Sequence, residues 1–303
     1  MNVLVVGAGG LASFVASRLL HAGVGVSIIG NSERVSEIGR HGIVINDRDF
    51  NSRHLIRTRR FSQIEPVDLV VLATRAHVAS FALAAASPAI TDKTLILPLA
   101  FDLIRLETLV EDGTGIPLGA VAEVDIAMRP DGTVRQTSER PVLRLGGLTC
   151  ASGVALEQLS RVFDDAGFEV KRSSDIRAHI FCRFMFSAIG AAFLKIVSAD
   201  AAERLSFARR KSLLSDLLYE ASRVAASLHL RLDESQVREY RNRFQRHSSC
   251  LPNAFGSPSS NAVTEAQHDL MVMVRHSQDT AVNAPTFMRA YYGAYPPSYG
   301  RAA

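Results

Sequence analysis

A glycine-rich turn near the N-terminus is the clearest chemical signal in the sequence. The segment Gly7-Ala8-Gly9-Gly10-Leu11-Ala12 fits the pattern G-x-G-x-x-A, between an aliphatic run and a helical pattern. In such a turn the first glycine permits the tight bend, the second lets the backbone approach a pyrophosphate, and the small last residue lets the helix pack closely on the strand. Free N–H groups at the helix N-terminus favour an anion. These six residues are therefore predicted to bind a dinucleotide cofactor.

The end of the second predicted strand, Ile28-Ile29-Gly30-Asn31-Ser32, indicates which dinucleotide is preferred. An NAD site usually has a carboxylate there, which accepts hydrogen bonds from the ribose hydroxyls. This strand tip has none, and the guanidinium of Arg34 follows closely in the sequence, suited to a 2′-phosphate. Asn31 and Arg34 therefore predict a preference for NADP. Glu33 is the competing interpretation, because a small backbone shift would aim its carboxylate at the ribose.

A second group of chemically capable residues lies late in the chain. Glu265 and Asp269 are four residues apart on one predicted helix, with His268 between them on nearly the same face. Such a group can supply an acid or a base. A lone histidine on a helix is more often a surface or packing residue, so both interpretations of His268 stay open.

The elements that must position these residues follow two patterns. β-rich runs separated by helical segments predict a parallel, doubly wound sheet, with strands at 2–6, 24–29, 67–73 and 95–99. Between residues 113 and 147 the texture changes to short segments with turn signals. Pro130-Asp131-Gly132 there predicts a hairpin, so the sheet domain is expected to end in antiparallel strands.

The rest of the chain has helical periodicity. Apolar residues recur every three to four positions and predict long helices at 176–197, 202–228, 234–246 and 264–278. The fold class is therefore predicted to be α/β, an N-terminal Rossmann-type doubly wound sheet domain followed by an all-α helical domain. With the linker near 171–174, the domains are expected at 1–172 and 173–303.

Composition excludes several other classes. The chain has 303 residues, 47% of them hydrophobic and 21% charged, with a net charge of +4 that is spread rather than clustered. Its three cysteines are widely separated and suggest neither disulfides nor zinc. The longest apolar stretches are interrupted by Arg75 and Lys195, before the roughly 18 residues that a membrane-spanning helix needs. We expect a cytoplasmic protein without metal, nucleic-acid partner or membrane segment.

Segments along nearly the whole chain resemble the ketopantoate reductase (2-dehydropantoate 2-reductase) family of pantothenate biosynthesis. They are MNVLVVGAGGLAS, VDLVVLATRAHVAS, GAVAEVDIAMRPDGTVRQ through RLGG, FDDAGFEVKRSSDIRAHIFCRFMFSAIGA and TEAQHDLMVMVRHSQDTAVNAPTFMRAYY, in the family's order and spacing. The resemblance implies hydride transfer from NADPH to a small 2-keto acid in a cleft between the domains. It also implies a homodimer.

The resemblance assigns site residues, most of which are substituted here. The family's proton-donating lysine falls on Arg183, the asparagine four residues later falls on Ser187, and the glutamate that holds a substrate hydroxyl is kept as Glu265. The lysine after the third strand falls on Arg75, which is a candidate contact for cofactor phosphate or substrate carboxylate; a plain surface arginine is the alternative. A serine that holds the substrate carboxylate falls near Asn253.

Arginine at the position of the proton donor changes the expected chemistry. A guanidinium stays protonated at any ordinary pH, so Arg183 is a poor proton donor but a good partner for a carboxylate or a developing alkoxide. Arg183, Ser187 and Glu265 are the catalytic candidates, and Asn253 and Asp269 are candidate substrate contacts. The alternative is that Arg183 only pairs with an acid such as Glu265.

Two functions follow from these residues. The first is an NADPH-dependent reductase of a 2-keto acid, with ketopantoate to pantoate as the family default and a divergent substrate as the alternative. The second is an NADP(H)-binding protein with little reductase activity, which serves sensing or a partner interaction. The substitutions at Arg183 and Ser187 favour the second.

Overall fold

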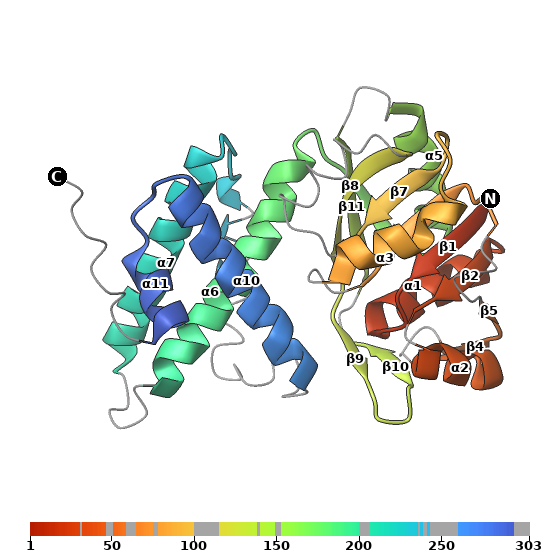
Figure 1. Cartoon of the computed structure of the whole chain (residues 1–303), viewed down its shortest axis with the longest axis horizontal. Coiled ribbons are helices and arrows are strands. Elements are labelled where there is room, and N and C mark those ends of the chain that lie inside the picture. Colours follow the sequence, from red (N-terminus) through yellow and green to blue (C-terminus); the bar gives the residue numbers. More distant parts are fainter. Residues whose placement is uncertain are drawn as a thin grey trace. The chain divides into compact units, whose positions relative to one another are not determined.

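Two units make up the chain, Met1–Ile180 and Phe181–Ala303 (Figure 1). The computed structural model describes residues 1–30, 32–46, 51–58, 65–74, 78–99, 115–137, 140–148, 153–199, 206–235, 237–238, 241–242 and 260–293. For residues 32, 51, 198, 199, 207 and 260–266 it describes the backbone alone.

An eight-stranded sheet in the order β12-β11-β8-β7-β6-β1-β2-β5 forms the first unit. Its strands are β1 (Asn2–Val6), β2 (Gly25–Ile29), β5 (Arg57–Thr58), β6 (Leu69–Leu72), β7 (Leu95–Pro98), β8 (Ile116–Glu123), β11 (Val142–Gly147) and β12 (Glu169–Arg172). The neighbours from β5 to β8 run parallel, whereas β11 runs antiparallel to β8. Since β2 and β6 lie on opposite sides of β1, the chain reverses its winding direction at β1. Ligands bind at the carboxyl ends of strands beside such a reversal.

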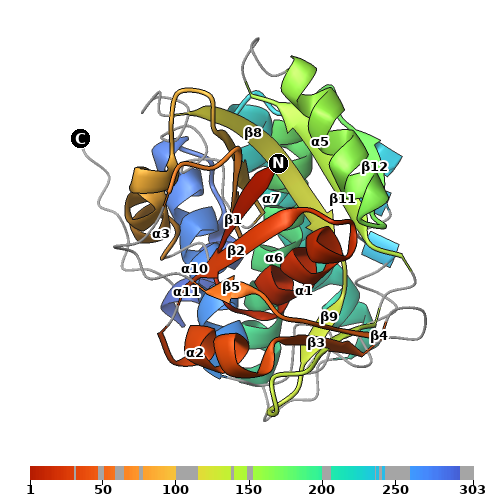
Figure 2. The same ribbon diagram turned by 90° about the vertical axis from the view of Figure 1, so that its right-hand side faces the viewer.

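Helices cover both faces of this sheet. Val3 and Val5 of β1 face a core shared with α1 (Gly10–His21) and α5 (Gly153–Asp165), whereas Leu4 and Val6 face a core shared with α3 (Ala79–Ala86). Figure 2 shows α1 and α5 on one side of the strands and α3 on the other. Because β1, β6 and β7 are covered twice, they are nearly all aliphatic, as the sequence predicted.

A smaller, four-stranded sheet in the order β4-β3-β10-β9 belongs to the same unit. Its strands are β3 (Ile43–Asn46), β4 (Asn51–His54), β9 (Ile126–Met128) and β10 (Val134–Gln136). Strands β9 and β10 form an antiparallel hairpin whose turn contains Asp131 and Gly132, which confirms the predicted hairpin. Strand β3 directly follows α2 (Ser32–His41) and pairs with β10.

The described elements of the second unit are helices. They are most of α6 (Ile176–Ala199), and α7 (Phe207–Ser227), α10 (Ser260–Asp279) and α11 (Pro285–Tyr292). The first turn of α11 is capped by Glu220 of α7, whose carboxylate accepts hydrogen bonds from the backbone N–H groups of Thr286 and Phe287 at 2.9–3.1 Å. In the helix expected at 234–246, the described residues 234–235, 237–238 and 241–242 are helical, and the other positions lie outside the described residues.

Helix α6 connects the two units. Its window 176–197 has a mean hydropathy of 1.8 and is long enough to cross a membrane, contrary to the expectation that Lys195 shortens every apolar stretch. However, 72% of that window is buried inside the structure, as in the core helix of a globular domain. Its first turn packs on the sheet, since a Cβ at Gly119 of β8 would lie 2.5 Å from the Ile176 side chain. The units therefore divide at residue 180, beyond the linker expected at 171–174.

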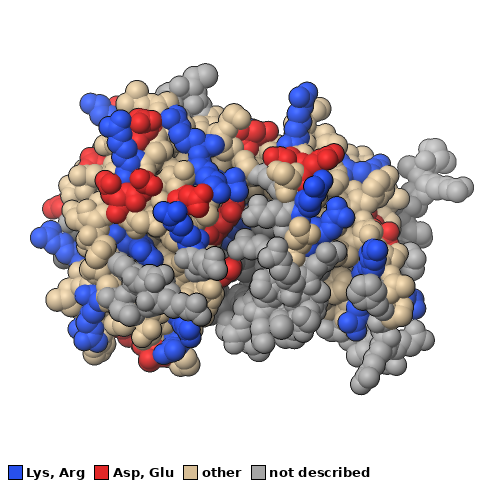
Figure 3. Space-filling view, turned by 180° about the vertical axis from the view of Figure 1, so that it is seen from behind, with Lys and Arg blue, Asp and Glu red and all other residues tan. Residues whose placement is uncertain are grey.

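On the face of the molecule drawn in Figure 3, charged side chains of both signs are interspersed among the described residues. This distribution agrees with the scattered charge seen in the sequence, and the absence of a nucleic-acid partner stays a prediction.

Candidate functional site

The glycine turn between β1 and α1 is constrained by its backbone. Gly7 has a φ of +126°, and its N–H donates to the carbonyl of Ile29 at the end of β2, at 2.8 Å. A Cβ at Gly7 would lie 2.5 Å from the carbonyl oxygen of Ala73, just past the end of β6. Only glycine combines this conformation with this close approach.

The N-terminus of α1 is open to a ligand. Gly9 occupies the N-cap position, where it has no side chain to cap the helix, and the first turn contains no acidic residue. A Cβ at Gly9 would have no described atom within 4 Å. The free N–H groups and the helix dipole therefore present positive potential to open space, which suits a pyrophosphate.

Small residues hold the turn close to its neighbours. Ala12 is fully buried, and its Cβ lies 3.4 Å from where a Gly7 Cβ would be. A Cβ at Gly30 would lie 3.2 Å from the backbone of Gly7 and Ala8, so the exit from β2 runs beside the turn. The structure thus brings together all six residues predicted for the pyrophosphate, and their contact with a cofactor stays a prediction.

Arg34, the predicted partner of a 2′-phosphate, lies in the first turn of α2. Its Nη1 contacts Glu37 Oε2 at 2.9 Å, and its Nη2 donates to the carbonyl of Gly132 in the β9–β10 turn at 2.8 Å. Its side chain is 21% exposed. Glu33, the competing ribose ligand, is exposed. Three other predicted site residues lie outside the described residues, namely Asn31, Arg75 and Asn253.

The residues predicted to be catalytic lie on α6 and α10 of the second unit. Arg183 and Ser187 are one helical turn apart on α6, and both are half-buried. The Ser187 hydroxyl donates a hydrogen bond to Asp269 Oδ2 on α10. The backbone of Glu265 lies one turn earlier on α10, and its side chain is not among those described. Arg183 forms no ion pair with any described acidic side chain.

The pairing of Ser187 with Asp269 joins positions 82 residues apart and was not predicted from the sequence. One indication of this pairing is present in the sequence. Ser187 lies four positions after the candidate Arg183, and Asp269 lies four positions after the candidate Glu265. That spacing identifies a face of each helix but not which faces meet. His268 is half-buried on α10 beside this pair.

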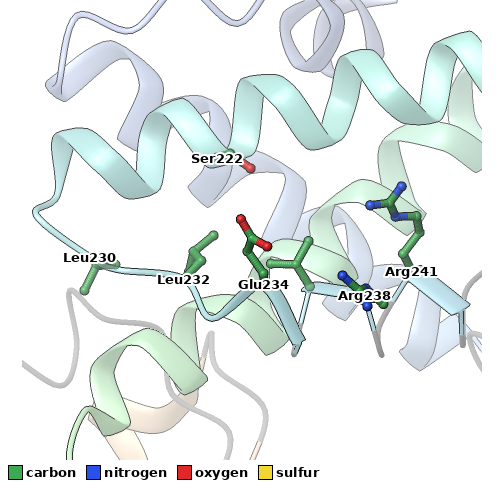
Figure 4. Close-up of a pocket in the computed structure, with 7 residues that line it drawn as sticks. Ser222, Leu230, Leu232, Glu234, Arg238 and Arg241 are labelled. Carbon is green, nitrogen blue, oxygen red and sulfur yellow. The ribbon is translucent and has the colours of Figure 1, made fainter.

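A cavity of about 490 Å³ lies elsewhere in the second unit, between α7 and the segment after it (Figure 4). It is lined by Ser222, Leu230, Leu232, Glu234, Val237, Arg238 and Arg241. None of the predicted site residues lines it, so it is separate from the α6–α10 pair.

Comparison with known proteins identifies the N-terminal part of the chain. Residues 3–145 match the family model of ketopantoate reductase PanE/ApbA. This part of the chain is therefore similar to ketopantoate reductases. This confirms, for residues 3–145, the resemblance found in the sequence.

Curated relatives match over part of their length. The chain is 24% identical over 176 residues to the 2-dehydropantoate 2-reductase of Pyrococcus horikoshii, covering 58% of this chain and 57% of that protein. It is 23% identical over 189 residues to the uncharacterized oxidoreductase YkpB of Bacillus subtilis, covering 62% of each. The matches thus span about three-fifths of these relatives.

Solved structures share the fold over nearly the whole chain. A PanE/ApbA family ketopantoate reductase from Ralstonia eutropha superposes with a TM-score of 0.81 at 20% identity, covering 96% of each chain. D-mandelate dehydrogenase with NADH and anilino(oxo)acetate gives 0.79 at 20% identity, again with 96% of each chain covered. The predicted fold class, a Rossmann-type domain followed by a helical domain, is confirmed.

Proposed function

We propose that this protein is an NADPH-dependent reductase that converts a small 2-keto acid into the 2-hydroxy acid. The phosphate turn is the observation that carries the proposal. Gly7 has a conformation and a close contact that exclude other residues, and Gly9 opens the helix N-terminus to an anion. The turn belongs to a ketopantoate reductase family domain, and a structural neighbour is described with NADH.

NADPH is proposed over NADH because of the residues after β2. The strand tip has no carboxylate, and Arg34 places a guanidinium in the first turn of α2, which begins two residues after Gly30, the neighbour of the glycine turn. Arginine suits a phosphate because its planar group donates two parallel hydrogen bonds. Since D-mandelate dehydrogenase is described with NADH, the preference must be measured with both nucleotides.

The residues of the second unit would bind the substrate and manage the proton. The bound nicotinamide supplies the hydride for the carbonyl carbon. Arg183 binds the substrate carboxylate or the negative charge that develops on the carbonyl oxygen. Ser187 donates a hydrogen bond to Asp269 Oδ2, which leaves the lone pairs of the serine oxygen as acceptors for a polar group of the substrate. Because Arg183 cannot readily release a proton and Asp269 accepts the Ser187 hydrogen bond, we assign protonation of the oxygen to the other acid on α10, Glu265.

Ketopantoate is the default substrate, and the substitutions at Arg183 and Ser187 favour a related 2-keto acid instead. The 2-dehydropantoate 2-reductase of P. horikoshii and D-mandelate dehydrogenase name two candidate substrate types, one aliphatic and one aromatic. We further propose that the protein acts in the cytoplasm and that it is a homodimer. Light scattering on the purified protein would test the dimer.

Turnover is the decisive test. NADPH oxidation would be followed with ketopantoate, phenylglyoxylate and pyruvate, while a thermal shift measures binding of NADPH and NADH. The expected result is stabilisation by NADPH together with turnover of at least one keto acid. Failure of both nucleotides to bind would contradict the proposal.

The second candidate function is an NADP(H)-binding protein with little reductase activity. Arg183 favours it, since a guanidinium stands where the family has its proton donor. Binding of NADPH without turnover of any keto acid in the same experiment would support this function over the first.

A further inference from the structure

The β9–β10 hairpin contacts both parts of the proposed cofactor site. A Cβ at Gly10, the first residue of α1, would lie 3.2 Å from Ile126 Cγ2 and 3.7 Å from Met128 Cβ, so β9 runs beside the glycine turn. The turn of the same hairpin accepts the hydrogen bond from Arg34. The hairpin therefore reaches from the predicted pyrophosphate position to the predicted 2′-phosphate position.

The hairpin turn is held in one conformation by its own hydrogen bonds. The N–H of Gly132 donates to the carbonyl of Arg129, and the N–H of Arg129 donates to the carbonyl of Thr133, both at 2.9 Å. The N–H of Thr133 also donates to Asp131 Oδ1 at 2.9 Å. Strand β10 is in turn paired with β3, which follows α2 directly. The carbonyl of Gly132 is thereby fixed relative to the helix that carries Arg34.

Gly132 also leaves the space that the guanidinium fills. Its φ is +79°, and a Cβ there would lie 2.8 Å from both Cζ and Nη2 of Arg34 and closer still to Nη1. The guanidinium therefore packs directly on the α-carbon of Gly132 while it donates to the carbonyl of the same residue at 2.8 Å. Glu37 holds the other amino group at 2.9 Å.

We propose that Gly132 is a positioning residue for cofactor specificity: through its carbonyl and its missing side chain it holds Arg34 in place for the 2′-phosphate of NADPH. This inference rests on the proposed function. It concerns the discrimination between the two nucleotides and not dinucleotide binding itself, because NADH lacks the phosphate that Arg34 would contact. An extra methyl group at residue 132 displaces the end of a long side chain and leaves the sheet intact.

The experiment measures the dissociation constants of NADPH and NADH by fluorescence titration for the parent, Gly132→Ala, Arg34→Ala and the double variant. Gly132→Ala is expected to weaken NADPH roughly tenfold while NADH changes less than about twofold, as for loss of one charged contact. In the Arg34→Ala background, Gly132→Ala should have no further effect on NADPH, because the residue acts through Arg34.

Gly23→Ala is the matched control. Gly23 has a φ of +77°, nearly that of Gly132, but a Cβ there would meet no described atom within 4 Å. Both alanines therefore carry the same backbone penalty, and only one displaces Arg34. Should Gly132→Ala fail to fold, Asp131→Ala loosens the same turn without adding an atom, and it should weaken NADPH alone.

Three results would overturn the inference. They are a Gly132→Ala variant that matches Gly23→Ala for both nucleotides, an equal loss of NADH and NADPH, and a loss of NADPH that persists in the Arg34→Ala background. With Asp131→Ala as the substitute, unchanged NADPH binding would overturn it. These results leave the proposed function standing, whereas a parent protein that binds neither nucleotide would overturn both.

Discussion

The glycine turn and the Ser187–Asp269 pair are two different ways to build a site. In the turn, backbone geometry does the work, because Gly7 is confined by the carbonyl of Ala73 and Gly9 exposes main-chain N–H groups. On α6 and α10 the site consists of side chains, joined by a hydrogen bond between positions 82 residues apart. The resemblance implies that the turn keeps the family pattern, whereas Arg183 and Ser187 replace the residues expected on α6. A backbone-built site tolerates little change, whereas a side-chain site can change its chemistry while the helices stay in place.

The strongest expected effect tests the backbone-built half of this comparison. Gly9→Asp should weaken NADPH binding by at least about a thousandfold, roughly 4 kcal/mol, because a carboxylate would occupy and repel the pyrophosphate position. Stability should change little, since a Cβ at Gly9 meets no described atom within 4 Å. The measurements are calorimetric titration with NADPH and thermal unfolding by circular dichroism.

Gly9→Ala is the control for this variant, because it adds a Cβ without charge. It should keep the fold and lose less affinity than Gly9→Asp. Normal NADPH binding by Gly9→Asp would place the pyrophosphate elsewhere and remove the contrast between the two sites.

The next effect tests whether side-chain chemistry on α6 matters. Arg183→Ala should lower kcat/KM on the best keto acid found. The expected loss of transition-state stabilisation is about 2–4 kcal/mol, as for a charged contact to a developing alkoxide. Arg183→Lys keeps the charge and restores a group that can titrate, so its pH dependence should differ from that of the parent. It should also raise activity on ketopantoate relative to the parent. Equal kcat/KM in all three proteins would show that Arg183 lies outside the chemistry.

The backbone-built parts of the molecule could be predicted from the sequence better than the contacts between distant segments. The strands β1, β6 and β7 and the glycine turn were predicted, because aliphatic runs and glycines at fixed spacing encode local backbone structure. The small sheet of β3, β4, β9 and β10 was missed except for its hairpin, since its strands are three or four residues long. Pairing between β3 and β10 joins segments about 90 residues apart, which no local pattern encodes.

The candidate site shows the same limit at the level of single residues. Arg34 and Gly132 were each singled out, one as a phosphate ligand and one as a turn former, and their contact at 2.8 Å was not predicted. Ser187 and Asp269 were likewise assigned separately. Helical spacing tells which residues share a face, whereas tertiary packing decides which faces meet.

A weaker effect is expected from the Ser187–Asp269 hydrogen bond. Ser187→Ala and Asp269→Asn should each lower kcat/KM. The expected loss of transition-state stabilisation is about 1–2 kcal/mol in each case, as for loss of a hydrogen bond to a charged group. If the two residues act as one pair, the double variant should be no worse than the poorer single variant. Additive losses would mean that the residues act separately, and unchanged kcat/KM with lowered stability would make the pair purely structural.

The smallest expected effect concerns the packing of helices in the second unit. A site made of side chains depends on the helices that carry them being held rigidly. Glu220 is 5% exposed, and burial raises the pKa of its carboxyl group despite the hydrogen bonds from Thr286 and Phe287; the negative charge of Asp216 raises this pKa further. In the unfolded chain the pKa of this carboxyl group returns to its ordinary value of about 4.3. The folded protein therefore holds this proton to higher pH than the unfolded chain does. The stabilising contribution is complete below the unfolded pKa and is lost as pH rises through the raised folded pKa.

Glu220→Gln removes this titration, so the free energy of unfolding of the parent relative to the variant should fall as pH rises through that window. Denaturant unfolding at a series of pH values measures the difference, with Asp216→Asn as a control that removes only the smaller, like-charge contribution. NADPH affinity should be the same in parent and Glu220→Gln, because the glycine turn contains no part of this network. Parallel stability curves for the two proteins would show that the cap on α11 does not titrate, and a change in NADPH affinity would mean that the two sites are less independent than their construction indicates.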